Sequence, residues 1–278
     1  MRIGSAVLVL LVLVAAAAPW LGTVDPTLFD AGSRDLVPGR AGEITTLDGE
    51  TIRHVFWMGS DSFGRDIYSR VLYGARVSLL VGLFAASLAL AFGIACGLSA
   101  GYLRWLDGIL MRFMDGIMAI PAILIAIALV ALWRGSLATI VIAIAIPEMP
   151  RVTRLVRSMV LSIREEPYVE AAVALGTPAW KIMLGHILPN CVAPLVVLGT
   201  YICANAILVE AILSFLGVGL PPDIPTWGNI MAEGRPQFND YPHNIFIPGA
   251  FLAATVLAVN ILGDGLRDTL DPKMAKRV

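Results

Sequence analysis

Long stretches without a charged residue alternate with short charged segments along this chain. The six longest charge-free stretches are residues 3–24, 77–103, 116–133, 135–147, 187–209 and 244–263. A helix needs about 20 apolar residues to cross the hydrocarbon core of a membrane, with roughly 17–25 as the usual range. Every stretch except 135–147 reaches that length, and 135–147 is short enough to be re-entrant. The pattern predicts an all-α integral membrane protein.

Composition supports the same class of protein. Hydrophobic residues make up 58% of the 278 positions and charged residues 15%, against about 25% charged in soluble domains. So few charges do not cover a water-soluble surface, and so many apolar residues exclude intrinsic disorder. The net charge of −1 argues against a nucleic-acid-binding protein, which carries a basic excess. The three cysteines predict neither a disulfide framework nor a zinc site.

The distribution of lysine and arginine predicts how the chain crosses the membrane. If residues 135–147 cross, 12 of the 20 basic residues collect on one side, over short segments. Positive residues stay on the cytoplasmic side, so we expect six spans with both termini in the cytoplasm, and Arg134 in a short external turn. The 12 residues are Arg2, Arg104, Arg112, Arg151, Arg154, Arg157, Arg164, Lys181, Arg267, Lys273, Lys276 and Arg277.

The spans divide the chain into segments. Residues 1–24 are expected to be an N-terminal anchor, and the alternative is a cleaved signal peptide, because Ala15–Ala18 loosely resembles a cleavage site. The five-helix core covers 77–265 and includes a cytoplasmic loop, 148–189, while 266–278 form a cytoplasmic tail.

Residues 25–76 form a polar external insert whose last part changes character. In residues 61–76, apolar positions recur at helical spacing between charged ones, which predicts an amphipathic helix at the membrane surface. These apolar positions are Ile67, Val71, Leu72 and Ala75.

Two enzyme motifs can be tested directly on the sequence. A phosphate-binding loop needs a lysine after a glycine, and none of the three lysines follows one, so ATP energy would have to come from a partner. Gly97-Leu-Ser99-Ala-Gly101 fits the G-x-S-x-G pattern of serine hydrolases, and His186 is placed on the same side as Ser99. The alternative, which we favour, is that Gly93, Gly97 and Gly101 let two helices pack closely.

The cytoplasmic segment predicts a helix–turn–helix. Ser162 and Glu165 are spaced as a capping box that opens a helix ending at Leu175, and Gly176 suits the left-handed stop after it. Thr177-Pro178 then cap a second helix, Ala179–Leu188, which ends before Pro189. Small alanines on the first helix would allow another protein to approach closely.

These residues carry a resemblance to a known family. Glu170-Ala-Ala-x3-Gly176-x11-Leu188-Pro189 resembles the EAA motif of the permease subunits of bacterial ABC importers, with His186 where isoleucine is usual. His-Ile-Leu-Pro is similar to the peptide and nickel branch of that family. Further segments between about residues 56 and 272 resemble its second, C-type permease: Gly59-Ser-Asp-Ser-Phe-Gly-Arg-Asp66, Tyr73-Gly-Ala-Arg76-Val-Ser-Leu, Ser214-Phe-Leu-Gly-Val-Gly-Leu-Pro-Pro222, Thr226-Trp-Gly and Gly263-Asp-Gly-Leu-Arg-Asp-x2-Asp-Pro272.

The resemblance implies a type I importer core in the bacterial inner membrane, carrying dipeptides, oligopeptides or a related solute such as a nickel complex. It implies four partners besides membrane lipid: a second homologous permease chain, two ATP-binding subunits and an external solute-binding protein. No nucleic acid, cofactor, metal or catalytic residue is implied. The expected ATPase-coupling residues are Glu170, Ala171, Ala172, Gly176, His186, Leu188 and Pro189.

Polar residues inside the expected spans give a second group of candidates. A carboxylate at membrane depth costs roughly 2.5–3.5 kcal/mol, so it faces protein or a water-filled path. Asn205, Glu210 and Asn260 either line the translocation route or bond neighbouring helices, and for Glu210 we favour gating or packing. A secondary transporter would need an internal repeat and ion ligands near the midplane, and the sequence displays neither.

Overall fold

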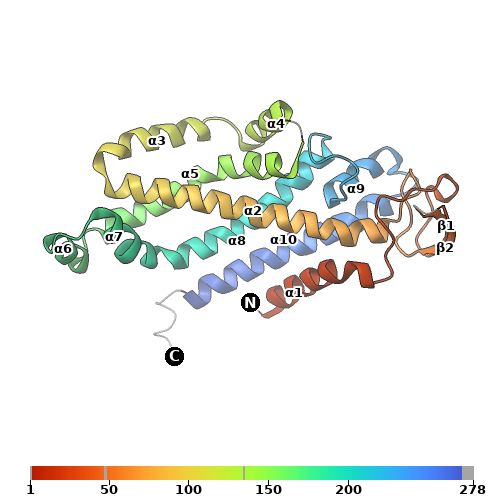
Figure 1. The fold of residues 1–278 in the computed structure, drawn as a ribbon, viewed down its shortest axis with the longest axis horizontal. Helices are drawn as coiled ribbons and strands as arrows, with labels where there is room; N and C mark the ends of the chain where they lie inside the picture. Colours follow the sequence, from red (N-terminus) through yellow and green to blue (C-terminus); the bar gives the residue numbers. More distant parts are fainter. Residues whose placement is uncertain (1, 47–48, 134, 271–278) are drawn as a thin grey trace.

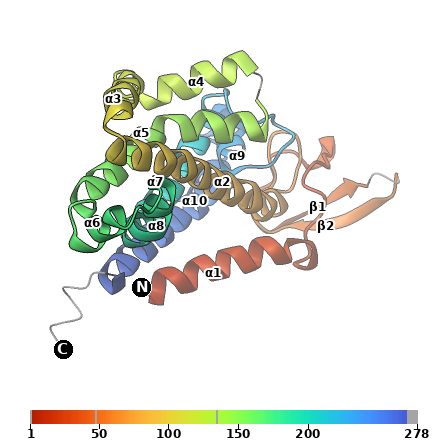
Figure 2. The same cartoon turned by 60° about the vertical axis from the view of Figure 1, so that its left-hand side comes forward.

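The computed structural model describes residues 2–46, 49–133 and 135–270. Long helices run along a common direction, with α1 and the α3–α4 pair on opposite sides of the bundle (Figures 1 and 2). The elements in chain order are α1 (Arg2–Ala17), β1 (Arg40–Thr45), β2 (Thr51–Phe56), α2 (Ile67–Tyr102), α3 (Arg104–Met118), α4 (Ala122–Trp133), α5 (Leu137–Ile163), α6 (Pro167–Ala174), α7 (Ala179–Ile182), α8 (Leu188–Phe215), α9 (Trp227–Gly234) and α10 (His243–Leu270).

The bundle has two distinct ends. One, which we call the α6 end, carries α6, α7 and the turn between α2 and α3 (Figure 1). This turn is tied to α5, because Arg164 donates to the carbonyl of Gly101 at 3.2 Å. The other, which we call the hairpin end, carries β1, β2 and α9. The junction of α4 and α5 lies towards the hairpin end, since Gly135 packs against the backbone of Gly219, in the segment that leads to α9.

Three helices among the described residues are long and apolar enough to cross a membrane. They are α2, the run Ala179–Phe215 and His243–Thr269, and the α3–α4 pair, bent by 87°, would add a fourth. The first helix is apolar but shorter, over Gly4–Trp20. By length and composition, three of the described helices support one span each and the bent pair a fourth, and the expected count of six stays a prediction. The helix α5 is 27 residues long, but its middle and second half carry four charged residues, Glu148, Arg151, Arg154 and Arg157.

The closest helix contact joins α2 to α5 through a row of glycines. A Cβ at Gly93, Gly97 or Gly101 would lie 2.4–2.6 Å from the Cβ of Val152, Val156 or Val160 respectively. Real side chains do not approach so closely, so the three glycines let the two backbones meet. The structure thus confirms the packing interpretation of the G-x-S-x-G segment, and the hydrolase interpretation loses its basis.

The insert, residues 25–76, differs from the all-α expectation. β1 and β2 form an antiparallel hairpin with Arg40 opposite Phe56 and Thr45 opposite Thr51. Ile44 and Phe56 are buried, while most other hairpin side chains are exposed. The two strands show the alternating burial that is typical of a half-buried strand. No strand was predicted in this segment, because its residues are mostly polar.

The expected surface helix is the beginning of α2. Asp66 caps it, its carboxylate accepting from the backbone N–H of Ser69 at 2.9 Å. The helix then continues for 36 residues without a break, and its first apolar positions, Ile67 and Val71, are buried against the rest of the protein rather than facing lipid.

Two sequence predictions reach beyond the described residues. The external turn expected at Arg134 lies outside them, as does most of the expected tail, residues 271–278. The part of that tail that is described is helical, because α10 continues to Leu270.

Candidate functional site

A short helical hairpin, residues 164–187, projects from the α6 end of the bundle (Figure 1). The helix α6 ends as predicted: Gly176 has a φ of +79°, and its N–H bonds to the carbonyl of Val173 at 2.9 Å. The N–H of Thr177 bonds to the carbonyl of Ala172 at 3.1 Å. This pair of bonds is the Schellman arrangement, which a glycine makes without strain.

The predicted capping box is wrong. Ser162 still lies inside α5, which ends at Ile163, and α6 begins at Pro167 with Glu166 as its N-cap. A residue before proline favours an extended backbone, and proline suits the first turn of a helix, so Pro167 sets the start. Pro178, not Thr177, is the N-cap of α7.

The second helix of the hairpin also differs from the prediction. It does not stop before Pro189 but passes through a π-helical turn, Met183–Ile187, directly into α8. Proline lacks the N–H for an ordinary helical bond, and the wider turn accommodates it. The hairpin is therefore continuous with a helix of spanning length, Ala179–Phe215. His186 lies in this turn with its Nδ1 buried and without a hydrogen-bond partner among the described residues.

The α6–α7 hairpin presents one buried and one exposed face. Val169 and Ala172 are buried against α5, α7 and the π turn, whereas Glu170 and Ala171 are exposed. The exposed face also carries large apolar side chains, which a soluble surface rarely gathers so closely. These are Tyr168, Val173, Leu175, Trp180 and Leu184, with Leu175 85% exposed. An apolar face with one carboxylate beside it is suited to binding another protein.

The polar candidates inside the bundle lie in different surroundings. Glu210 is completely buried and accepts from the hydroxyls of Ser214 at 2.8 Å and Ser78 at 3.4 Å. This geometry favours the packing interpretation for Glu210. Asn260 donates to the carbonyl of Val256 in its own helix at 3.0 Å.

Asn205 reaches a residue that the sequence analysis missed. Its amide donates at 2.8 Å to Glu148 of α5, which is only 6% exposed and also pairs with Arg151 at 3.3 Å. Glu148 directly follows the charge-free stretch 135–147, where a charge marks the end of an apolar stretch and does not single the residue out.

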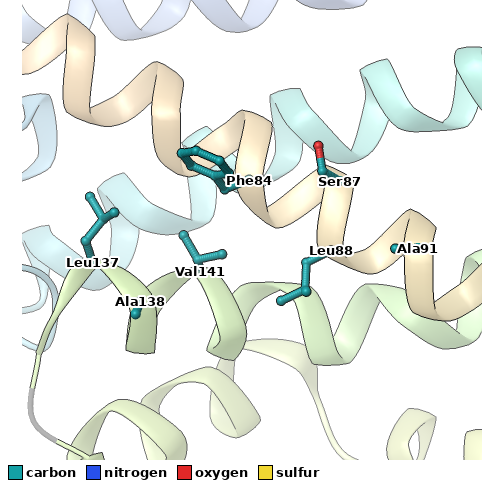
Figure 3. Close-up of a pocket in the computed structure, with 7 residues that line it drawn as sticks. All are labelled: Phe84, Ser87, Leu88, Ala91, Leu137, Ala138 and Val141. Atoms are coloured by element: carbon teal, nitrogen blue, oxygen red, sulfur yellow. The ribbon is translucent and has the colours of Figure 1, made fainter.

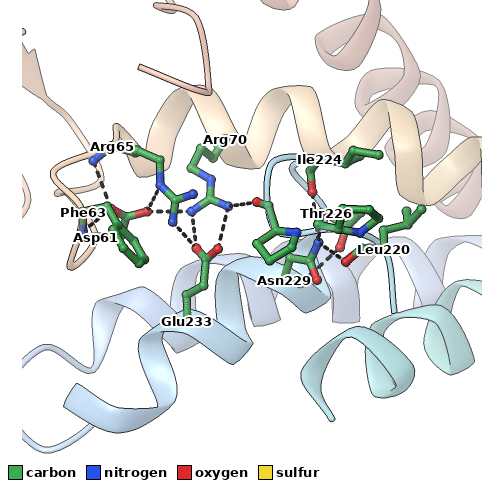
Figure 4. Close-up of polar contacts among 11 residues, drawn as sticks. Asp61, Phe63, Arg65, Arg70, Leu220, Ile224, Thr226, Asn229 and Glu233 are labelled. Atoms are coloured by element: carbon green, nitrogen blue, oxygen red, sulfur yellow. Dashed lines mark hydrogen bonds and ion pairs between the residues drawn. The ribbon is translucent and has the colours of Figure 1, made fainter. Parts of the chain in front are cut away.

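A second polar cluster joins the insert to α9 at the hairpin end (Figure 4). Asp61 accepts from Arg65 at 2.7 Å and from Arg70 at 2.6 Å, and Glu233 pairs with both arginines. Nearby, the Asn229 amide donates to three carbonyls of the preceding loop, those of Leu220, Pro221 and Ile224, at 3.0–3.1 Å. Two of the motifs that carry the family resemblance, around Asp61 and around Trp227, are thereby brought together.

An open groove between α2 and the start of α5 is lined almost entirely by apolar side chains (Figure 3). Ser87 contributes the one polar side chain. A groove of this kind fits a lipid chain or an apolar helix face, and it offers nothing that would hold a charged solute. The lining residues are Phe84, Ser87, Leu88, Ala91, Leu137, Ala138 and Val141.

Comparison with known proteins points in one direction. Residues 89–276 match the family described as "Binding-protein-dependent transport system inner membrane component". The chain is 47% identical over 275 residues to the "Probable peptide ABC transporter permease protein y4tQ" of Sinorhizobium fredii, covering 99% of this chain and 89% of the relative. It is 47% identical over 229 residues to the "Dipeptide transport system permease protein DppC" of Alkalihalophilus pseudofirmus, covering 82% and 75% respectively.

The fold has a counterpart among solved structures. A chain of the MetNI methionine ABC transporter, in an inward-facing conformation, aligns with a TM-score of 0.58 at 17% identity, covering 73% of this chain and 96% of that chain. At that identity the likeness concerns the fold alone.

Proposed function

Because the chain belongs to the family of binding-protein-dependent transport system inner membrane components, we propose that it is a permease subunit of an ATP-driven importer of small peptides. It would form half of a translocation pathway whose other half is a second, homologous permease chain. The peptide as solute rests on the relatives, which are named for peptide and dipeptide transport. A related solute such as a nickel complex is the alternative, which the resemblance of the loop motif keeps open.

The α6–α7 hairpin is the observation that carries this proposal. It is a compact unit with an exposed apolar face, held by a Schellman turn, and it is continuous with α8 through the π turn. A rigid element of this kind transmits a displacement to the helix that follows it. An ATP-binding subunit gripping the exposed face could therefore move α8.

The mechanism follows from that connection. Two ATP-binding subunits, closing on ATP, would push the hairpins of both permeases and re-orient the cavity between them. In this arrangement the chain itself hydrolyses nothing. The opposite end of the bundle, which carries β1, β2 and α9, would receive an external solute-binding protein. The contacts would come from the insert and from residues 217–243, which include α9. The topology that fits these contacts has six crossings with both termini in the cytoplasm.

The proposal is tested by reconstituting the chain with the products of neighbouring genes in proteoliposomes. ATP-dependent uptake of labelled trialanine, delivered by the binding protein, is the expected result. In the Glu170→Gln variant, which removes one exposed charge from the hairpin, we expect at least a fivefold loss of ATPase co-purification or of uptake. Membrane insertion should be unchanged, because the side chain of Glu170 is exposed.

Glu165→Gln provides the matched control. Glu165 is an exposed glutamate in the same loop, but it lies outside the EAA-like segment, so its replacement should leave uptake near the wild-type rate. Uptake driven by an ion gradient without ATP would contradict the proposal, as would full coupling in the Glu170→Gln variant.

A further inference from the structure

A half-exposed arginine lies well inside the apolar part of the bundle. The side chain of Arg151 on α5 is 48% exposed. Its neighbour Val152 packs against Gly93 of α2, ten residues before the charge-free stretch ends at Leu103. At a rise of about 1.5 Å per residue, this places Arg151 about 15 Å inside that stretch. The backbone of Arg151 therefore lies within the part of the bundle that is expected to cross the hydrocarbon.

Neighbouring side chains hold Arg151 in one orientation. Its Nη1 lies 3.3 Å from Glu148 Oε2, one turn earlier on α5, and its guanidinium carbon lies 5.0 Å from the ring centre of Tyr201 on α8. Glu148 is itself held by the amide of Asn205, one turn beyond Tyr201 on α8. Two helices thus supply a built polar site whose carboxylate is buried and whose guanidinium is open on one side.

Lipid is an unsuitable neighbour for this open side. A charged arginine at the centre of a membrane helix is energetically costly, so intramembrane charges face protein or a water-filled path. The exposed side of α8 continues the same surface, because Tyr201 is 48% exposed and Asn205 is partly exposed. The surface that joins Arg151, Tyr201 and Asn205 is therefore expected to face the path between the two permeases.

We propose that Arg151 binds a carboxylate of the transported solute as it passes the middle of the membrane. Guanidinium offers a planar fork of N–H donors that fits a carboxylate in two-point fashion, and of the residues that the structure describes only Glu148 pairs with part of that fork. Glu148, Asn205 and Tyr201 act as positioning residues. This inference rests on the proposed function, because the carboxylate is taken to be that of a peptide.

The pairing of Arg151 with Glu148 gives the site an affinity for the solute that suits transport. A solute site in a pathway must bind well enough to admit the solute and weakly enough to release it. The buried carboxylate offsets the charge of Arg151, so a passing carboxylate shares the guanidinium instead of being trapped by it. A site of this kind favours passage over retention.

The test measures trialanine uptake by the reconstituted complex carrying Arg151→Gln, Arg151→Lys or Arg154→Gln. We expect at least a tenfold loss with glutamine at 151, a smaller loss with lysine, and a rate near wild type for Arg154→Gln. Arg154 is the matched control, because it lies one turn along α5, has a similarly exposed side chain and pairs with Asp115 instead. Assembly of the complex should stay unchanged in all three variants, and the basal ATPase rate should stay unchanged in Arg154→Gln, which lies outside the proposed site.

Two further peptides separate the sources of the carboxylate. Each is supplied at equal concentrations of loaded binding protein. Trialanine amide, which has no carboxylate, should be transported equally by wild type and Arg151→Gln. Ala-Glu-Ala amide, with a side-chain carboxylate only, should regain the sensitivity if the site reads any carboxylate, and should lack it if the site reads the C-terminus.

Water access provides an independent readout. With Cys96, Cys191 and Cys203 replaced by alanine, Arg151→Cys should react with a charged thiol reagent in the assembled complex. Leu257→Cys, on an exposed apolar position of α10, should not react.

Three outcomes overturn the inference: trialanine uptake within twofold of wild type in Arg151→Gln, no labelling of Arg151→Cys, or loss of the partner permease in Arg151→Gln. The last would make Arg151 an assembly contact. If the wild-type complex itself transports no peptide, the proposed function fails and not this site alone.

Discussion

At the scale of single residues, Arg70 is a deeply buried charge at the hairpin end. It is 1% exposed and lies between Asp61 and Glu233, which belong to the insert and to α9. Removing one partner of a buried ion pair leaves an uncompensated charge and typically costs about 3–5 kcal/mol. The three side chains thus form a polar lock between two segments that are distant in sequence.

The first prediction concerns this lock. Arg70→Met keeps most of the side-chain volume. It leaves Asp61 and Glu233 with Arg65 as their remaining ion-pair partner among the described residues. We expect a loss of about 3 kcal/mol in the free energy of unfolding, measured by thermal or denaturant unfolding of the purified protein. The control is Arg53→Met, on the exposed strand β2, with an expected change within about 0.5 kcal/mol. Equal effects of the two substitutions would contradict the lock.

Some polar residues inside the bundle were predictable from the sequence, but their partners were not, for a physical reason. Asn205 and Glu210 stand out because they interrupt apolar stretches, and the structure gives both a hydrogen-bonded place. Glu148 and Arg151 follow the end of an apolar stretch, where charge is unremarkable. Their meeting with α8 depends on the register between two helices, and no pattern within one helix specifies that register.

At the scale of elements, the packing of α2 against α5 depends on the absence of side chains at three positions. A Cβ at Gly97 would lie 2.6 Å from the Cβ of Val156 and 2.8 Å from the backbone oxygen of Thr153. A backbone atom cannot move aside as a flexible side chain can. Even a methyl group at this position must push the helices apart.

The second prediction follows. Gly97→Ala should destabilise the protein by about 1–3 kcal/mol through overpacking, and Val156→Ala in the same chain should restore part of the loss. Gly108→Ala is the control, because nothing lies within 4 Å of its Cβ position, and alanine there favours the helix. Unfolding of the three variants and the wild type in one detergent would decide the matter, and a Gly97→Ala variant as stable as Gly108→Ala would contradict the close contact.

Elements were predictable from the sequence where one pattern governs them. The glycine spacing predicted that this part of α2 packs closely against another helix, and Gly176 predicted the left-handed turn that ends α6. The predicted starts of α6 and α7 were wrong, because Pro167 and Pro178 determine where these helices begin, in place of the capping patterns. The hairpin in the insert was missed because its strands are short and mostly exposed, so hydrophobic alternation is faint.

At the scale of the whole molecule, the course of the chain depends on the bent pair α3–α4. A bend of 87° suits either a broken span or a re-entrant loop. If the pair crosses, α5 returns the chain and the α6–α7 hairpin shares a side with the α2–α3 turn. If the pair re-enters, the α6–α7 hairpin lies on the same side of the membrane as the insert, residues 25–76. The packing of Gly135 against Gly219, at the hairpin end, favours the crossing.

The third prediction separates these courses. In a chain without its native cysteines, single cysteines at Arg104, Ser136 and Trp180, all exposed positions, are labelled with an impermeant maleimide in intact cells and in inverted vesicles. A crossing pair makes position 136 reactive from outside, and positions 104 and 180 from the cytoplasmic side only. Basic residues gather around 104 and 180, which the positive-inside rule places in the cytoplasm. Labelling of position 180 in intact cells would put the hairpin beyond the reach of any ATP-binding subunit, and the coupling mechanism would fail with it.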